Sequence, residues 1–415
     1  MAVADPVRAR RDAMAAEHGI APDEAAADWR RLLAGASRPD AVVVATPDRE
    51  HAAPAIEALR RNLDVVLEKP IAPTAEEIRA VGRAAAASAG GVTVAHVLRY
   101  TPFFAAVKRA LDEGWIGELV TIEHAERIGY WHFAHSFVRG SWRRESEASP
   151  MILAKACHDL DLVRWLAGDR CTAVASFGGL HHFRPAQAPA GALDRCADGA
   201  RRCPAAPECP FDAVRLYVER TAGVDGWPVS VITDDPSREG RMRALADGPY
   251  GRCVYRSDND VADHQVVALE FANGVHATLT VNGLTADNTR HVRLHGTLGE
   301  LRGRLDTGEI EVRRHLPGAE ASPGSWDRDE LGRHAMRGDQ RMVLTAAPAR
   351  LDGHGGGDDA MLADVIGRLR ARRDGLVGAE DTARTSLAAS IESHVMAFAA
   401  EQSRRERRLV ELAAQ

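Results

Sequence analysis

The strongest constraint on the fold is a regular alternation of apolar, strand-like runs with helical segments over residues 1–97. Residues 41–45 and 65–67 are short and apolar throughout, which is typical of strands buried on both faces of a sheet. A helical pattern follows each run, and Thr74 has the side chain and the position of a helix N-cap. Strands that alternate with helices in this way predict an α/β domain built on a parallel sheet.

The pattern changes from about residue 118, where longer strands appear whose apolar and polar residues partly alternate. Asn273-Gly274 separates two of these strands and is a strong hairpin signal. Helices are expected at residues 155–166, 359–372 and 379–402. We therefore expect residues 98–415 to form an α+β domain with an open, mainly antiparallel sheet, which a cysteine-rich insertion interrupts at about residues 183–263.

Asp5 follows a short apolar run, the context in which a doubly wound nucleotide-binding domain places the acid that binds the ribose. Such a domain opens with a strand, a glycine-rich loop and a helix, yet only four residues precede Asp5. We therefore expect an incomplete domain that lacks its first strand and glycine loop, with the true start upstream of Met1. Without that loop most pyrophosphate contacts are missing, which weakens cofactor binding. The alternative is that Asp5-Pro6 is merely a turn.

The overall composition excludes some classes of function. A net charge of −6 and a pI near 6.3 give no reason to expect a nucleic-acid partner. No apolar run approaches the roughly 18 residues that suggest a membrane span, and no charged-then-apolar leader opens the chain. We expect a cytoplasmic protein with neither a membrane nor a nucleic-acid partner, in which the six cysteines are reduced or bound to metal.

Lysine is scarce: of 53 basic residues only Lys69, Lys108 and Lys155 are lysines, and the others are arginines. A lysine kept where arginine is so common is a candidate for chemistry that arginine cannot perform, because a lysine ammonium can lose its proton. Lys69 ends an apolar run and precedes Pro70, and Lys155 lies three residues before His158. Lys108 has the surroundings of a solvated helix face. We therefore expect Lys69 and Lys155 to be functional.

The tripeptide Glu68-Lys69-Pro70 after a buried strand resembles a motif of the Gfo/Idh/MocA family of NAD(P)-dependent oxidoreductases. Further matches to the family lie at residues 45–48, His51, and residues 115–118, 158–161 and 296–300. They cover nearly the whole chain except the absent front and the insertion. The resemblance implies a Rossmann-type NAD(P)-binding domain at residues 1–97. A substrate and oligomerisation domain at residues 98–415 follows, in a homo-oligomer (a dimer or tetramer) that acts on a polyol or sugar.

The resemblance and the strand ends together assign the expected cofactor contacts to Asp5, Thr46, Pro47, His51, Glu68 and Lys69. Lys69 lies at the carboxyl end of a strand, where open α/β sheets place their ligands. Asp5 favours NAD over NADP, because a carboxylate pairs with the ribose 2′-hydroxyl and repels a 2′-phosphate.

Three residues are expected to be catalytic: Lys69, His158 and Lys155. In the family the lysine that matches Lys69 binds the oxygen on the hydride-transfer carbon. A neutral imidazole such as His158 accepts a hydroxyl proton near working pH; the alternative is a hydrogen-bonded core histidine. The family usually carries an aspartate where this chain has Ala154. Either Lys155 takes that polar role, or Lys69 and His158 suffice.

The segment at residues 129–135 is rich in aromatic rings and imidazoles, which suit a sugar pocket. Trp131, His132 and His135 are therefore candidate substrate-binding residues, with Arg99 as a weaker candidate, and local packing is the alternative.

Cys196, Cys203 and Cys209 occur within fourteen residues, and Cys253 follows in the same insertion. Four thiolates can close a structural zinc site that would hold together a segment poor in apolar residues. The gaps are looser than the usual paired spacing, and free buried thiols are the alternative.

These observations predict an NAD(P)-dependent, inositol-dehydrogenase-like oxidoreductase. It would transfer hydride between nicotinamide and a secondary alcohol or carbonyl of a sugar, sugar acid or cyclitol. Two alternatives stay open: a non-catalytic sensor or partner-binding protein on the same fold, which Ala154 favours, and an NAD-dependent glycosidase.

Overall fold

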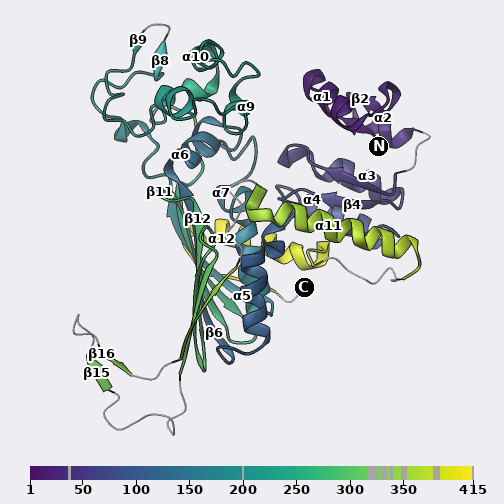
Figure 1. Cartoon of the computed structure of the whole chain (residues 1–415), viewed down its shortest axis with the longest axis vertical. Helices are drawn as coiled ribbons and strands as arrows, with labels where there is room; N and C mark the ends of the chain where they lie inside the picture. Colours follow the sequence, from purple (N-terminus) through teal and green to yellow (C-terminus); the bar gives the residue numbers. More distant parts are fainter. Residues whose placement is uncertain are drawn as a thin grey trace. The chain divides into compact units, whose positions relative to one another are not determined.

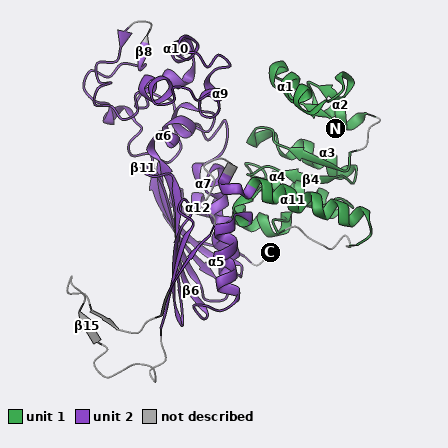
Figure 2. Ribbon diagram, viewed as in Figure 1, with its two compact units in different colours: residues 1–99, 358–395 green, residues 100–357, 396–415 purple. Residues whose placement is uncertain are grey.

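The computed structural model describes residues 1–35, 39–198, 201–315, 326–328, 334–336, 340–346, 353–376 and 384–413. The chain divides into two compact units (Figure 2). The first contains residues 1–99 and 358–395, and the second contains residues 100–357 and 396–415. This differs from the sequence-based division, which assigned everything after residue 97 to the second domain.

The first unit is a parallel α/β structure, as the alternating pattern predicts. Strands β3 (Ala41–Val44), β4 (Asp64–Leu67) and β5 (Val92–Val94) pair in that order, all parallel. Strand β1 (Val3–Ala4) pairs in parallel with β2 (Ala25–Ala26) in a separate small sheet. The helices are α1 (Arg8–His18), α2 (Trp29–Ala34), α3 (Ala52–Arg60) and α4 (Ala75–Ala86). Thr74 caps α4, because its hydroxyl accepts the Glu77 N–H.

Residues 358–395 join the first unit through the edge of β5. The Val94 N–H donates to the Thr385 carbonyl at 2.8 Å, and Thr93 forms an antiparallel bridge with Ser386. Arg372 of helix α11 (Gly353–Arg373) pairs with Asp64 at 2.8 Å. Backbone pairing between residues nearly three hundred positions apart has no local sequence signal, which is why the sequence pattern missed it.

The second unit is built on a large sheet that includes β6, β11 and β12 (Figure 1). Among the described residues this sheet has nine strands, in the order β17-β14-β13-β12-β6-β11-β10-β7-β18. Only the β6–β11 pair is parallel in this sheet, so the expected open, mainly antiparallel sheet is confirmed. Its strands are β6 (Leu119–Gly129), β7 (Cys171–Gly179), β10 (His264–Phe271), β11 (His276–Thr285), β12 (Thr289–Gly296), β13 (Gly299–Arg304), β14 (Glu309–Arg314), β17 (Gln340–Thr345) and β18 (Val410–Glu411). The predicted hairpin at Asn273-Gly274 joins β10 to β11, with Gly274 at a φ of 84°.

One face of this sheet is covered by helices and forms the core of the unit. Helix α8 (Cys157–Ala167) packs on β6 and β11, and α5 (Pro102–Asp112) packs on β14. Ile122, Leu279 and Leu294 are buried on this face. Gly283 of β11 allows the close approach of α6 (Tyr130–Phe133), because a Cβ there would lie 2.4 Å from the Phe133 ring. Helix α12 (Leu387–Glu406) leads to the edge strand β18.

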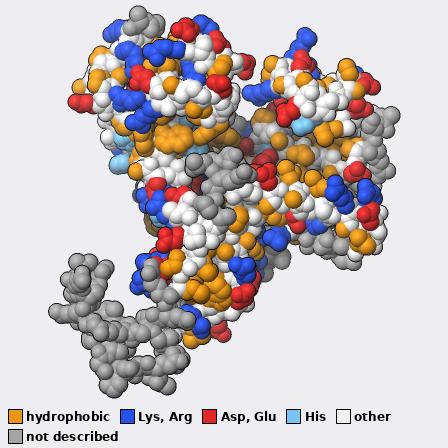
Figure 3. Space-filling view, viewed as in Figure 1, with side chains coloured by type: hydrophobic (Ala, Val, Ile, Leu, Met, Phe, Trp, Pro, Cys, Tyr) orange, Lys and Arg blue, Asp and Glu red, His pale blue; other side chains and the backbone are white. Residues whose placement is uncertain are grey.

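The segment between β7 and β10 is the expected insertion, and it has an apolar core of its own. Val214, Tyr217, Val218 and Leu245 belong to one buried cluster, against which Trp131 and Tyr250 pack. The insertion contains the antiparallel strands β8 (Ala197–Asp198) and β9 (Arg201–Arg202) and the helices α9 (Val229–Ile232) and α10 (Arg238–Asp247). Acidic and basic side chains are interspersed over its visible surface (Figure 3).

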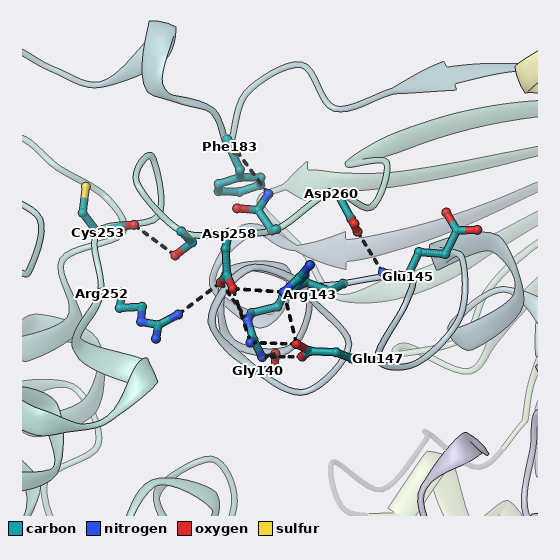
Figure 4. A network of polar contacts seen from close by, with 12 residues as sticks. Gly140, Arg143, Glu145, Glu147, Phe183, Arg252, Cys253, Asp258 and Asp260 are labelled. Carbon is teal, nitrogen blue, oxygen red and sulfur yellow. Dashed lines mark hydrogen bonds and ion pairs between the residues drawn. The ribbon is translucent and has the colours of Figure 1, made fainter. Parts of the chain in front are cut away.

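Polar contacts tie the end of the insertion to the segment at residues 143–145. Asp258 accepts from Arg143 at 2.8 Å and pairs with Arg252 at 3.1 Å, and the Asp260 carboxylate accepts the Glu145 N–H at 2.8 Å (Figure 4). The insertion is therefore part of the second unit and is tied to it by these contacts.

Arg139 is a buried anchor for the insertion. Its Nε donates to the Arg252 carbonyl at 2.8 Å and its Nη2 to the Phe211 carbonyl at 2.7 Å.

We expect Arg139→Met to destabilise the insertion by about 2–4 kcal/mol, because both buried carbonyls lose their donor. Limited proteolysis should show earlier cleavage within residues 180–263. Arg256→Met is the matched control, since its ion pair with Asp194 is exposed and such pairs contribute little. Equal resistance of the two variants would contradict the anchoring role.

Among the described helices, none combines the length with the apolar character that crossing a lipid bilayer requires.

Candidate active site

Polar side chains of the first unit gather where its parallel strands end. Thr46 follows β3, Lys69 follows β4 and His96 follows β5. Because the three strands are parallel, their carboxyl ends meet at one edge of the sheet, the place where open α/β sheets bind ligands.

His51 connects the loops after β3 and β4. Its Nδ1 lies 2.6 Å from the Pro70 carbonyl oxygen, and its Nε2 lies 2.7 Å from the Thr46 carbonyl oxygen. Both neighbours are acceptors, so a neutral ring satisfies one of them and an imidazolium both. The hydroxyl of Thr46 is buried without a hydrogen-bond partner among the residues that the structure places. A buried hydroxyl without a partner fits a hydrogen-bonding ligand such as a ribose at this edge.

The Glu68-Lys69-Pro70 turn is braced from both sides. The Lys69 N–H donates to Glu68 Oε2 at 3.1 Å, and the Ile71 N–H donates to His394 Nε2 at 2.9 Å. The Lys69–Pro70 peptide is cis. The Lys69 side chain is half-buried, so its ammonium is partly accessible at the end of β4.

His96 is a candidate that the sequence interpretation missed. It follows the last residue of β5 by two positions, the same offset at which Lys69 follows β4, and this offset was the available signal. Burial, followed by the charges of Arg99 and Lys69, holds the pKa of His96 well below its usual range, so the ring is neutral. Arg99 is buried and donates to the Arg384 carbonyl at 3.1 Å, so it helps to hold residues 384–395 to the first unit.

Asp5 lies just after β1. Its carboxylate accepts the Val7 N–H at 2.7 Å, and its own N–H donates to the Ala26 carbonyl at 3.1 Å. Oδ1 is therefore engaged in a turn, as the alternative interpretation of Asp5-Pro6 proposed, while the position at a strand end is the one expected of a ribose-binding acid.

In the second unit, Lys155 joins a buried network of charges. It lies between α7 (Met151–Ala154) and α8, and its Nζ is 3.4 Å from Glu126 Oε1 on β6. Arg290 Nε of β12 lies 2.8 Å from Glu126 Oε2 and 2.9 Å from Asp159 Oδ1. His124 Nε2 lies 2.8 Å from the same Asp159 oxygen. Lys155 thus pairs with Glu126, which belongs to a network of charged groups from two strands and one helix.

The two carboxyl groups of this network differ in their pKa values. Burial raises the pKa of Glu126, and Arg290 only partly opposes that effect. Burial acts on Asp159 in the same direction, but Arg290 and His124 outweigh it and lower the Asp159 pKa to about 2. Asp159 is therefore a permanent anion, whereas Glu126 is the carboxyl group that more readily takes a proton.

His158 is buried in the first turn of α8, with its ring 5.5 Å from that of His354. His132 is half-buried on α6, and its Nδ1 lies 3.0 Å from Asn288 Oδ1. The same oxygen accepts the Gly129 N–H at 3.0 Å. Burial and then the charge of Lys155 lower the pKa of His132 to about 3, so its ring is neutral and its Nε2 is an acceptor.

Three of the candidate substrate residues, Trp131, His132 and His135, lie in an aromatic cluster that the insertion completes. The Trp227 ring lies 5.5 Å from Trp131, 5.2 Å from His132 and 5.4 Å from His135. His135 also stacks on Tyr250 at 4.8 Å, and burial, followed by Arg139, lowers its pKa to about 4. Trp227 was missed because the weak periodicity of the insertion does not indicate which of its residues face the sheet unit.

The zinc prediction is not supported. In the described part of the chain, no group of three or more His, Cys, Asp or Glu side chains is arranged to hold a metal ion. Cys196, Cys203, Cys209 and Cys253 all line one cavity, and none of them forms a disulfide. Burial raises the pKa of Cys209 and Cys253. The segment is also richer in buried apolar residues than its sequence suggested, because the insertion has an apolar core of its own.

Two family comparisons agree with these features. Residues 1–96 match the oxidoreductase family with an NAD-binding Rossmann fold, and residues 108–412 match the C-terminal alpha/beta domain of the same family. The chain therefore belongs to the Gfo/Idh/MocA family of oxidoreductases.

Among its relatives, a Bacillus subtilis protein named as an oxidoreductase, YteT, is 26% identical over 83% of this chain and 76% of its own length. Inositol 2-dehydrogenase 4 of Saccharopolyspora erythraea is 32% identical, over 47% of this chain and 53% of its own length, so the chain spans about half of that relative. A levoglucosan dehydrogenase solved with NADH and levoglucosan has the same fold, with a TM-score of 0.66 and 18% identity over 100% of this chain and 90% of that one.

Proposed function

We propose that this protein is an NAD-dependent dehydrogenase of a secondary alcohol on a cyclitol or sugar. The observation that carries the proposal is the rigid Glu68-Lys69-Pro70 turn, which presents a lysine at the carboxyl end of β4 in a chain of this oxidoreductase family. Inositol and levoglucosan dehydrogenases among the similar proteins support the class of substrate.

The cofactor, when bound, accepts a hydride from the alcohol carbon or returns it. In the proposed reaction Lys69 donates a hydrogen bond to the reacting oxygen, and the charge that develops on that oxygen is stabilised. His158 or Lys155 takes the hydroxyl proton, since both are groups that can exchange one. Thr46, Pro47, His51 and Glu68 are the proposed cofactor contacts, and Asp5 favours NAD over NADP.

The aromatic cluster supports a sugar or cyclitol substrate. Trp131 is half-buried and Trp227 is 47% exposed, so both indole rings offer faces that can stack on the C–H face of a ring. We propose that Trp131, His132 and Trp227 contact the substrate.

Homo-oligomer formation is part of the proposal. Apolar side chains on the open face of the sheet are exposed to solvent, with Phe177 at 70% and Val266 and Val343 nearly half exposed. Apolar exposure of this kind along one sheet face favours pairing with a second copy of the chain.

The function is tested by incubating the protein with NAD⁺ and a panel of cyclitols and sugars, including myo-inositol and levoglucosan, while the absorbance of NADH is followed. We expect NADH to form with at least one member. Aryl glycosides are tested in parallel, because phenol release without net NADH would indicate the NAD-dependent glycosidase instead. Tight NADH binding without turnover of any compound would favour a sensor or partner-binding protein.

A further inference from the structure

The buried neighbour of Lys155 has features that a purely structural ion pair does not need. The Lys155 side chain is 19% exposed, whereas that of Glu126 is 3% exposed. Lys155 is therefore the partly exposed member of the pair, and Glu126 is the sealed one. It also directly follows Ala154, the position at which the related enzymes are expected to carry an acid.

Glu126 is incompletely satisfied. Arg290 Nε lies 2.8 Å from Glu126 Oε2, but its N–H is directed at Asp159 Oδ1, with which it forms the hydrogen bond at 2.9 Å. Within the described ranges, Glu126 Oε2 is a buried oxygen with no hydrogen-bond partner. A buried carboxylate with an unused oxygen pays a desolvation penalty, which protonation removes.

The surrounding charges favour a division of roles between the two acids. Glu126 faces Lys155, Arg290 of β12, Asp159 of α8 and His124 of its own strand. Lys155 additionally lies within the electrostatic range of the neutral His132 of α6. Asp159 accepts hydrogen bonds from Arg290 and His124 and so stabilises this part of the structure. Glu126 instead pairs with Lys155.

We propose that Lys155 and Glu126 form a two-residue proton relay for the oxidised hydroxyl, an inference that rests on the proposed dehydrogenase function. In the resting pair Lys155 is an ammonium and Glu126 a carboxylate. One N–H bond of Lys155 breaks as an O–H bond forms on Glu126 Oε1. The neutral amine then accepts the hydroxyl proton of the substrate as the carbon gives its hydride to NAD⁺. The carbonyl product forms, both electrons leave with the hydride, and the extra proton is stored on Glu126.

In this scheme Lys155 is a catalytic residue and Glu126 is a positioning residue that acts through it. The Lys155 ammonium then releases one proton to solvent, because it is the member of the pair with appreciable exposure. Glu126 returns its stored proton to the neutral amine, which restores the resting pair. The relay supplies the acid–base function that Ala154 cannot provide.

Kinetic measurements on Glu126 variants distinguish a role in storing the proton from a role in packing. We expect Glu126→Gln to lower kcat about 100-fold, in line with the loss of a general acid–base group, with little change in KM or NADH affinity. Glu126→Asp keeps the carboxyl group and should recover part of the activity, although its side chain is shorter. Glu123→Gln on the same strand is the control, because Glu123 is exposed, and it should behave as wild type. A kcat for Glu126→Gln as high as that for Glu126→Asp would overturn the relay.

The scarcity of lysine permits a second measurement that needs no substrate. Protein labelled with ¹³C at lysine Cε should give one signal for each of the three lysines, and Lys155→Arg identifies the signal of Lys155. We expect that signal to shift as Glu126 is protonated, at a pH above the ordinary pKa of a glutamic acid. The step should vanish in Glu126→Gln and persist in Glu123→Gln.

A Lys155 signal that titrates identically in wild type and Glu126→Gln would show that the two groups do not exchange or sense a proton, and would overturn the proposal. If the step is present but no substrate of the panel turns over, the coupled pair stands and the proposed dehydrogenase function fails, so the two failures are distinguishable.

Discussion

Lys69→Arg is expected to lower kcat about 100- to 1000-fold, the loss seen when one hydrogen-bond donor to a developing oxyanion is displaced. The substitution keeps the positive charge but replaces a compact ammonium by a wide planar fork. Lys69 stands on a turn that His394 holds through the Ile71 N–H, so the backbone cannot readily move to accommodate the larger group. Steady-state kinetics with the substrate found in the panel measures the effect.

The control for this prediction is Lys108→Arg. Lys108 lies on helix α5 and pairs with Asp112 on the same helix, so an arginine there keeps the interaction. We expect wild-type kinetics for this variant. Full activity of Lys69→Arg would contradict both the role of Lys69 and the argument that rare lysines mark chemistry. Unchanged NADH affinity beside a reduced kcat would place the defect in the reaction step.

Asp159→Asn is expected to destabilise the second unit by about 3–5 kcal/mol, the cost of breaking a buried ion pair from one side. Arg290 and His124 would both lose their shared carboxylate, and Arg290 would remain buried beside Glu126 alone. Chemical denaturation followed by circular dichroism measures the change. Asp287→Asn is the control, because its partners Arg127 and Arg304 are more exposed and its loss should cost no more than about 1 kcal/mol.

The Asp159 effect has a definite pH dependence. The folded-state pKa of about 2 lies below the ordinary value, so the carboxylate stabilises the fold at higher pH. That contribution should be complete above about pH 4 and lost as the pH falls towards 2. The difference in unfolding free energy between wild type and Asp159→Asn should therefore shrink over this window. A constant difference from pH 6 down to the acid limit would show that the charge of Asp159 is not the cause.

Local patterns were sufficient for most of the fold. Each signal is local in the sequence: an apolar run for β3 and β4, a turn dipeptide at Asn273-Gly274, and alternation of apolar and polar residues in the later strands. Such signals depend only on residues that are near neighbours in the chain. The pairing of Thr385 and Ser386 with β5 could not be predicted, because backbone hydrogen bonds between distant residues do not depend on side-chain type. The core of the insertion was missed for a related reason, since its apolar residues follow no regular period.

Some residues of the candidate site could likewise be named from the sequence, and others could not. Lys69, Lys155 and His158 could be named from the sequence, because their residue types are rare or chemically distinctive in their surroundings. Glu126 and Arg290 could not be named, because a glutamate or arginine in a strand usually faces solvent and nothing local indicates that these two are buried. Trp227 could not be named because the periodicity of the insertion is weak.

The sequence by itself determined the class of fold, the family and the presence of a lysine at a strand end, since periodicity and short motifs record local geometry. Only the tertiary structure decided what each lysine meets: a buried glutamate for Lys155, a helix partner for Lys108 and a braced turn for Lys69. The physical reason is that burial and distance set the charge state of a group, and both arise from strands and helices that the chain brings together from far apart.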